Sequence, residues 1–239
     1  MKIVIVMPAY NAAKTIESVF ERIPADFWQK LSNVIVVNDG STDNVVEVLE
    51  RLKQKYKNIT VLTHNPNRGY GPAQKTGFTE AMRIGADIAI LLHSDGQYAP
   101  EMLFEMVRPI ETGEADVVTG SRMLGGGALK GGMPMHKYIG NRALTIIENI
   151  AYGMNISEYH TGYMVYSKKA LAAIPFMKLS DTFHFDGEMI MMSGKKRLRI
   201  REVPIPTRYA DEESHLKPIK YGINVLKIIW KNWRGKYDF

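Results

Sequence analysis

The sequence predicts an α/β fold in which a mostly parallel sheet is flanked by helices. Short, wholly apolar runs alternate with segments whose apolar residues recur at helical spacing. This order is typical of parallel sheets, because the crossover between parallel strands is usually a helix and both faces of the sheet become buried. The apolar runs also end in polar residues, glycine and proline. Ligands of such sheets bind beyond the carboxyl ends of the strands.

The expected elements follow one another regularly in the first half of the chain. The strands are residues 3–7, 34–37, 59–62, 88–92 and 117–118. The helices between them cover 16–23, 45–56, a stretch opening at Gly71-Pro72, and 100–110. The second half is less regular, with a glycine-rich mobile loop at 120–132, helices at 141–152 and 186–193, and strands at 163–166 and 198–205.

Polar clusters at the ends of four expected strands should share one rim of the sheet. They are residues 8–11, 38–40, 65–71 and 93–95. Asp39 could accept a hydrogen bond from a nucleotide base or a ribose hydroxyl, or it could only cap the following helix. Arg68 lies among turn residues just before a helix N-terminus, which suits an anionic ligand as well as an ordinary turn.

The segment after the fourth strand offers ligands for a divalent cation. In an extended chain His93, Asp95 and Gln97 point to the same side. Such a site needs further ligands, which a diphosphate commonly supplies to Mg²⁺ and Mn²⁺. The alternative is that these residues only lead into a helix at Pro100. The sequence has no GxxxxGK[ST] loop and no GxGxxG before the first helix, which excludes P-loop and Rossmann dinucleotide sites.

Composition bounds the location and the partners. The 239 residues are 45% apolar and include no cysteine, which fits a globular chain in a reducing compartment. We see neither a signal peptide nor a run of about 18 apolar residues, so we expect a cytoplasmic protein that is at most peripheral on a membrane. From Lys217 onward the chain carries six lysines or arginines and one acid, which accounts for five of its six net charges.

The C-terminal segment, residues 218–239, is expected to form a basic amphipathic helix beside a main domain over 1–217. Its apolar residues recur at helical spacing, with lysines beside them: Ile219, Ile223, Leu226, Trp230 and Trp233. This pattern fits a helix lying in a membrane interface. It also fits a helix that packs on its own domain or on a second subunit.

Taken together, the motifs resemble glycosyltransferase family 2, and most closely its polyprenyl-phosphate, or dolichyl-phosphate mannose synthase-like, branch. The matching stretches are "PAYN" (8–11), "VNDGSTD" (37–43), "NRGYGPA" (67–73), "DGQYAPE" (95–101), "GSR" (120–122), "HTGYMVYSKKAL" (160–171), "EVPIPTRY" (202–209) and "SHLK" (214–217). Each stretch is weak alone, but the ordered set is specific. The resemblance implies a GT-A fold and a sugar transfer with inversion from a nucleotide diphosphate sugar, with GDP-mannose and UDP-hexoses as the main candidates.

The resemblance also implies roles for single residues. Asp95, Gln97 and His93 would hold Mg²⁺ or Mn²⁺, with His93 in place of the first acid of the family's DxD motif. Arg122 and Arg208 look like phosphate clamps. The donor nucleotide would be bound by residues from the strand ends: Pro8, Ala9, Tyr10, Asn11, Asp39, Arg68, Gly71, Lys75 and Ser94.

The acceptor decides whether a base is required. A phosphate monoester has a second pKa of about 6 and attacks without losing a proton, whereas a sugar hydroxyl of a glycan needs a general base. Asp186 lies where many family members place that base, although it could instead cap its own helix.

The basic tail favours a polyprenyl phosphate, with a membrane surface or a membrane protein as partner of the C-terminal helix. Two other classes are less well supported. A sugar nucleotidyltransferase would need a glycine-rich basic signature near residues 7–11, which this chain lacks. A nucleic-acid-binding module would use the basic tail but leave the acids of the rim without a role.

Overall fold

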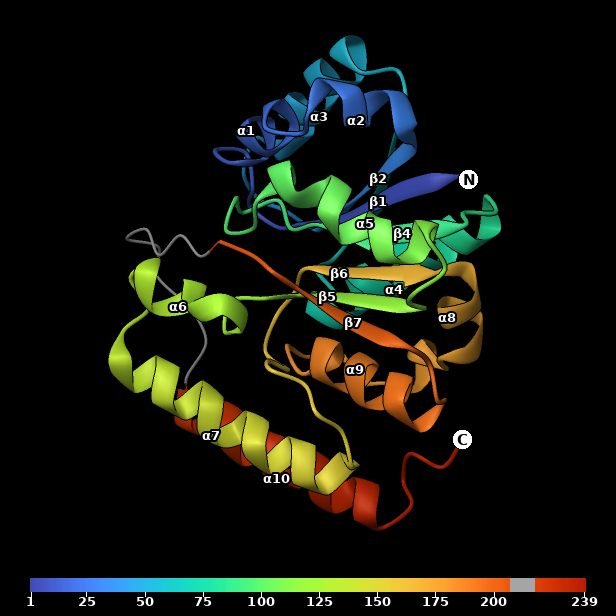
Figure 1. The fold of residues 1–239 in the computed structure, drawn as a ribbon. Coiled ribbons are helices and arrows are strands. Elements are labelled where there is room, and N and C mark those ends of the chain that lie inside the picture. Colours follow the sequence, from blue (N-terminus) through green and yellow to red (C-terminus); the bar gives the residue numbers. More distant parts are fainter. Residues whose placement is uncertain (207–217) are drawn as a thin grey trace.

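A seven-stranded sheet forms the centre of the molecule in the computed structural model, which describes residues 1–206 and 218–239 (Figure 1). The strands are β1 (Ile3–Ala9), β2 (Leu31–Asp39), β3 (Ile59–His64), β4 (Ile88–Leu91), β5 (Val117–Ser121), β6 (Met164–Ser167) and β7 (Ile200–Pro204). They lie in the order β3-β2-β1-β4-β6-β5-β7. Strand β6 runs antiparallel to β4 and β5, and the other neighbours are parallel. The predicted α/β fold with a mostly parallel sheet is confirmed.

Helices cover both faces of this sheet. One face carries α1 (Ile16–Glu21), α2 (Ala25–Lys30), α3 (Val45–Lys55) and α5 (Leu103–Glu111), the last preceded by the 3-10 turn η1 (Pro100–Met102). The other face carries α4 (Tyr70–Arg83), α8 (Lys168–Ala173) and α9 (Phe185–Lys195), with η3 (Phe176–Lys178) between α8 and α9. Helices α2 and α8 were not predicted, because each has only six residues and so offers little helical repeat.

The continuous apolar run of β1 has a direct cause in this layering. Ile3, Ile5 and Met7 belong to the core beneath α1, α2, α3 and α5, whereas Val4 and Val6 belong to the core beneath α4, α8 and α9. Successive side chains of a strand point to opposite faces of its sheet. Because both faces are covered, every position of this strand has to be apolar.

The prediction of a mobile loop at 120–132 is wrong for most of this segment. Strand β5 continues to Ser121, and η2 (Leu124–Gly126) and α6 (Gly127–Lys130) follow it. Gly125 and Gly126 have φ angles of 72° and 73°, a region that glycine enters without steric cost. Glycine therefore kinks the chain between two short helical turns here. A small cluster of buried side chains, which includes Met123, Ala128 and Met133, packs this segment.

Two long helices lie together at the end of the molecule far from α1 to α3 (Figure 1). Helix α7 (Met135–Tyr152) begins six residues earlier than predicted, and Gly140 within it weakens its helical signal. Helix α10 (Pro218–Trp233) packs beside α7 through Val225 and Ile229, which are buried. Among the described residues, no helix combines the length and the apolar character that a membrane span requires.

Candidate active site

The carboxyl ends of β1, β2, β3 and β4 gather at one edge of the sheet, as predicted. The chain order switches direction between β1 and β4, which is where open α/β sheets bind their ligands. Ser94 ties these two strand ends together, because its buried hydroxyl donates to the carbonyl oxygen of Pro8 at 2.8 Å. Both residues were predicted to contact the donor nucleotide, and the structure places both of them at this switch point.

Asp39, at the end of β2, organises the loop that precedes α4. Its carboxylate accepts from the backbone N–H groups of Arg68 (2.9 Å) and Gly69 (2.8 Å) and lies 2.6 Å from Nδ1 of His64. The carboxylate is buried, whereas the Arg68 side chain is exposed. Asp39 therefore does not cap α3. Its contact with a nucleotide remains a prediction, which the unused acceptor capacity of the carboxylate allows.

The turn after β1 is fastened to the turn after β2. Asn11 has a φ of 51°; its N–H donates to Ser41 Oγ at 3.0 Å, and its Oδ1 accepts from Thr42 N at 2.8 Å. Ala9 is buried under this turn, while Tyr10 is exposed on its outside. Ser41 thus holds the turn rather than capping α3, and Tyr10 offers an open aromatic face at the rim.

Gly71 and Lys75, two further predicted donor contacts, face the segment before α9. Lys75 is buried and its Nζ donates to the carbonyl oxygen of Leu179 and to Asp181 Oδ1, both at 2.6 Å. A Cβ on Gly71 would come within 2.7 Å of Asp181 Cα. These two residues contact the segment that leads into α9. Their contact with the donor stays a prediction.

A hydrogen-bonded chain joins His93 to Asp186 across the site. The hydroxyl of Tyr70 donates to Asp186 Oδ2 and lies 3.2 Å from His93 Nε2. His93 is also packed against the ring of Tyr98, whose hydroxyl accepts from Gly162 N at 2.6 Å. Burial raises the pKa of Tyr98 to about 12, so its hydroxyl stays protonated at neutral pH.

Asp186 is a buried carboxyl group inside the first turn of α9. Burial raises its pKa, and the neighbouring His93 and the hydrogen bond from Tyr70 lower it to a smaller extent. The adjacent Gln74 side chain lowers the pKa of Asp186 as well, although neither Asp186 Oδ1 nor the polar atoms of Gln74 reach hydrogen-bond geometry with any described residue. The helix begins at Phe185 with His184 at its N-cap, so capping is not the role of Asp186. Buried polar atoms without partners are typical of a place where water or a ligand completes the contacts.

Asp95 and Gln97 lie together beyond β4. Asp95 is half-buried and its Oδ1 accepts from Gln97 N at 3.0 Å, which leaves capacity on the carboxylate for a cation. Within the described part of the chain, no group of three His, Cys, Asp or Glu side chains could hold a metal ion. The carboxylate, imidazole and amide at this rim therefore fit a divalent ion only if further ligands come from a bound molecule such as a diphosphate.

Arg122, which follows β5, is held by a buried acid. The carboxylate of the fully buried Glu158 accepts from three groups of Arg122. These are the backbone N–H at 2.7 Å, Nε at 3.0 Å, and Nη2. The same guanidinium donates to the carbonyl oxygen of His160 at 2.5 Å. This fixes the orientation of the side chain, which stays partly exposed. Arg208, the second predicted clamp, lies outside the described residues.

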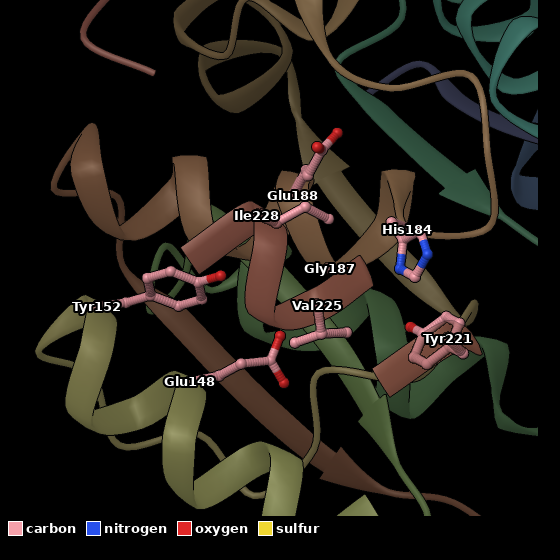
Figure 2. A pocket seen from close by; sticks show the side chains of 8 residues that line it. All are labelled: Glu148, Tyr152, His184, Gly187, Glu188, Tyr221, Val225 and Ile228. Carbon is pink, nitrogen blue, oxygen red and sulfur yellow. The ribbon is translucent and has the colours of Figure 1, made fainter. Parts of the chain in front are cut away.

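Three tyrosines that sequence reasoning missed surround these groups. Tyr70 and Tyr98 contact His93, and Tyr221 from α10 contacts His160 and His184. Figure 2 shows Tyr221 beside His184, among the side chains that line a small pocket. The two flanking tyrosines lie within predicted motifs, "NRGYGPA" and "DGQYAPE", and that position was the only available signal. Nothing in the sequence placed Tyr221 near the site.

A family model described as glycosyl transferase family 2 matches residues 4–174. A UDP-N-acetylglucosamine–dolichyl-phosphate N-acetylglucosaminyltransferase from Methanococcus voltae is 30% identical over 221 residues, covering 87% of this chain and 86% of that protein. An undecaprenyl-phosphate mannosyltransferase from Micrococcus luteus is 27% identical over 206 residues, covering 86% and 83%.

Solved structures with the same fold include glucosyl-3-phosphoglycerate synthase from Mycobacterium tuberculosis in complex with Mn²⁺, UDP and glucosyl-3-phosphoglycerate. It superposes with a TM-score of 0.66 and is 18% identical, covering all of this chain and 80% of that one. This likeness supports the GT-A arrangement of the sheet and its flanking helices.

Proposed function

The chain belongs to glycosyl transferase family 2, and we propose that this glycosyltransferase moves a sugar from a nucleotide diphosphate sugar to a polyprenyl phosphate. The observation that carries the proposal is the link from His93 through Tyr70 to Asp186, in a chain that matches lipid-phosphate sugar transferases over most of its length. Tyr98, which packs on His93, also lies within reach of the charges of Arg122 and Asp95. GDP-mannose and UDP-hexoses remain the candidate donors, since the two relatives differ in the sugar that their names specify.

Departure of the nucleoside diphosphate is the step that needs positive charge. Asp95 would anchor Mg²⁺ or Mn²⁺, with Gln97 and His93 beside it, and a bound ion would neutralise the diphosphate as it leaves. The M. tuberculosis synthase with the same fold contains Mn²⁺ and UDP. His93 is turned toward Tyr70 by its Nε2, so we assign it Nδ1 as the atom available to a ligand.

Attack by the acceptor needs no base when the acceptor is a phosphate. An oxygen of the lipid phosphate, a dianion near neutral pH, would form the bond to the anomeric carbon as the bond to the donor's diphosphate breaks, with inversion. Arg122 would orient the phosphate, because Glu158 and the carbonyl oxygen of His160 hold its guanidinium in place. Arg208 is proposed as a second phosphate contact.

Asp186 is better suited to positioning than to proton transfer in this reaction. Its carboxyl is buried and bonded to Tyr70, which in turn meets His93. The alternative acceptor, a hydroxyl of a glycan, would require Asp186 as a general base. The buried placement of Asp186 and the two relatives named for lipid-phosphate acceptors favour the phosphate.

The acceptor would be met at a membrane surface through α10. The outer side of this helix exposes Trp230 (58%), Trp233 (74%) and Ile223 (50%). Lys220, Lys227 and Lys231 of the helix are exposed, as is Arg234 just after it, and the helix contains no acid. Apolar side chains beside lysines suit the boundary of an anionic bilayer. We accordingly treat 1–217 as the catalytic domain and 218–239 as a docking segment, peripheral on the cytoplasmic face.

The test is transfer of labelled sugar from a panel of GDP-mannose, UDP-glucose and UDP-N-acetylglucosamine to polyprenyl phosphate. We expect Asp95→Asn to lose at least about a hundredfold in turnover and to lose the stabilisation by donor plus Mn²⁺ in thermal shift. Asp87→Asn, at the opposite end of β4, is the matched control and should retain both. Full metal-dependent turnover by Asp95→Asn would refute the metal assignment.

A second variant separates the two acceptors. Asp186→Asn preserves a group that can accept from Tyr70, so we expect transfer to polyprenyl phosphate to remain within about tenfold of the wild type. A loss of several orders of magnitude with the fold intact by circular dichroism would instead favour a base-dependent reaction.

A further inference from the structure

One side chain of α10 reaches between two histidines that belong to different segments. The ring of Tyr221 stacks on His184, with centroids 4.3 Å apart and planes at 28°. It meets His160 edge-on at 5.3 Å, and its hydroxyl lies 3.0 Å from His160 Nδ1. Figure 2 shows Tyr221 and His184 lying next to each other, among pocket residues that come from α7, α9 and α10. The helix proposed to dock on the membrane is thus joined to the catalytic domain by the aromatic contacts of Tyr221 with His160 and His184, which we call the aromatic clasp.

Both histidines belong to segments that build the active site. The carbonyl oxygen of His160 accepts from Arg122 Nη2 at 2.5 Å. His184 lies at the N-cap of α9, two residues before Asp186. A displacement of Tyr221 would therefore move the support of Arg122 on one side and the start of α9 on the other. The link from Tyr221 to Arg122 is the more direct of the two, because only His160 lies between them.

One ring nitrogen of each histidine beside Tyr221 makes no hydrogen bond with the described residues. His184 Nδ1 has no hydrogen-bond partner among the described residues. His160 Nε2 lies 3.2 Å from Glu148 Oε2 on α7, without the alignment of a hydrogen bond. A pocket lined by Glu148, His184 and Tyr221 lies between the helices (Figure 2). Buried polar atoms without hydrogen-bond partners call for an explanation, and a contact that adjusts when α10 binds a surface supplies one.

We propose that Tyr221 is a positioning residue that transmits the seating of α10 on a lipid surface, through His160, to the phosphate-binding side chain of Arg122. This inference rests on the proposed function, because Arg122 is taken there to orient the acceptor phosphate. Seating of α10 holds Tyr221 in its contact with His160 and thereby fixes Arg122 for the acceptor. The donor side of the site, at the ends of β1 and β2, is left unchanged.

Three variants test the link. Tyr221→Leu removes the stacking and the hydroxyl, and Tyr221→Phe removes only the hydroxyl. Asn224→Ala is the matched control, on the same helix but outside the pocket that His184 and Tyr221 line. Transfer is measured in detergent and on vesicles of phosphatidylcholine and phosphatidylglycerol in a two-to-one ratio. For Tyr221→Leu we expect wild-type donor binding and vesicle flotation, but an acceptor KM raised about tenfold and no stimulation by vesicles. Tyr221→Phe should lie between it and the wild type.

The same link is measured without substrate. In the protein with labelled histidines, these vesicles should shift the imidazole signals of His160 in the wild type and in Asn224→Ala, but not in Tyr221→Leu. Absence of transfer to polyprenyl phosphate in the wild type would defeat the proposed function while this signal still reports the link. Wild-type acceptor KM and vesicle stimulation in Tyr221→Leu would overturn the inference, and so would unchanged His160 signals in the vesicle-bound wild type.

Discussion

At the scale of single residues, the proposed site depends on side chains that the ends of β2 and β4 deliver to one edge of the sheet. Asp39 ends β2, and Ser94 and Asp95 follow β4 within four residues, so their place at this edge was predictable from the sequence. The link from Tyr70 to Asp186 was not predictable, since 116 residues separate the two partners. Sequence spacing indicates which side of a strand or helix a residue occupies, but not which distant side chain meets it.

Gly162 is the residue whose replacement should show how tightly this site is built. A Cβ at this position would lie 2.7 Å from His93 Nε2 and 3.2 Å from the Tyr70 hydroxyl. Tyr70 and Tyr98 pack against His93, so the imidazole has little room to retreat. For Gly162→Ala we expect turnover to fall by about tenfold to a hundredfold, and the free energy of unfolding to fall by about 1–3 kcal/mol.

Steady-state kinetics and urea unfolding measure these two effects. Gly140→Ala, within α7, is the control, because a Cβ there meets no atom within 4 Å. Alanine also favours a helix over glycine by about 1 kcal/mol, so this control should be as stable as the wild type or more so. Wild-type turnover in Gly162→Ala would mean that His93 can move without consequence.

Secondary-structure elements were predictable where burial alone determines them. Strands β1 and β4 are apolar at every position because helices cover both faces of the sheet, and that pattern is visible in the sequence. Segment 120–132 was mispredicted because its six glycines suggested a loop, whereas two of them allow the kinks that separate η2 from α6. Glycine content reports conformational freedom, and it does not distinguish a mobile chain from a packed one.

Asp116 joins three elements and should contribute measurably to stability. At the start of β5, its buried carboxylate accepts from Arg199 N at 2.9 Å, from Arg199 Nε at 3.1 Å and from Lys169 Nζ at 3.2 Å. The Arg199 hydrogen bonds hold the pKa of Asp116 well below its usual range. For Asp116→Asn we expect the free energy of unfolding at pH 7 to fall by about 1–3 kcal/mol, an estimate that allows for the exposure of both cations.

The pH dependence follows from the direction of that shift. A carboxyl whose pKa is lowered by folding stabilises the protein at pH values above its unfolded pKa of about 3.9, and this contribution is lost as the pH falls below it. Urea unfolding should therefore show a difference between the wild type and Asp116→Asn that shrinks as the pH falls below about 4. Glu47→Gln, on the exposed side of α3, should leave stability unchanged. A difference that persists undiminished into acid would contradict the charged role.

At the scale of the whole molecule, the sequence predicted an apolar stripe on the C-terminal helix but not what lies under it. Val225 and Ile229 are buried, whereas the described side chains of the predicted stripe are exposed, namely Ile223, Leu226, Trp230 and Trp233. The side chain of Ile219 lies outside the described part of the chain. The helix therefore packs on its own domain, one of the predicted alternatives, but not through these four side chains. Helix α7 adds exposed Ile146 and Ile150, although helical spacing alone would have assigned such residues to a core. Exposure depends on how the two helices pair, which the sequence pattern does not contain.

The outward stripe predicts binding to anionic vesicles that depends on both apolar and charged side chains. Replacing both tryptophans, in Trp230→Ser with Trp233→Ser, removes the side chains suited to the membrane boundary, and we expect at least about a tenfold loss in the vesicle partition coefficient. Lys227→Gln with Lys231→Gln should cost about 1 kcal/mol per cation and make the remaining binding less sensitive to salt. Val46→Ser, exposed on α3 at the far side of the sheet, is the matched control.

Flotation of vesicles with and without phosphatidylglycerol measures each partition coefficient, and sedimentation of the lipid-free protein provides the counter-test. If the wild type is a dimer that ignores vesicles, and the tryptophan variant is a monomer, then the stripe binds a second copy of the chain instead of a lipid surface.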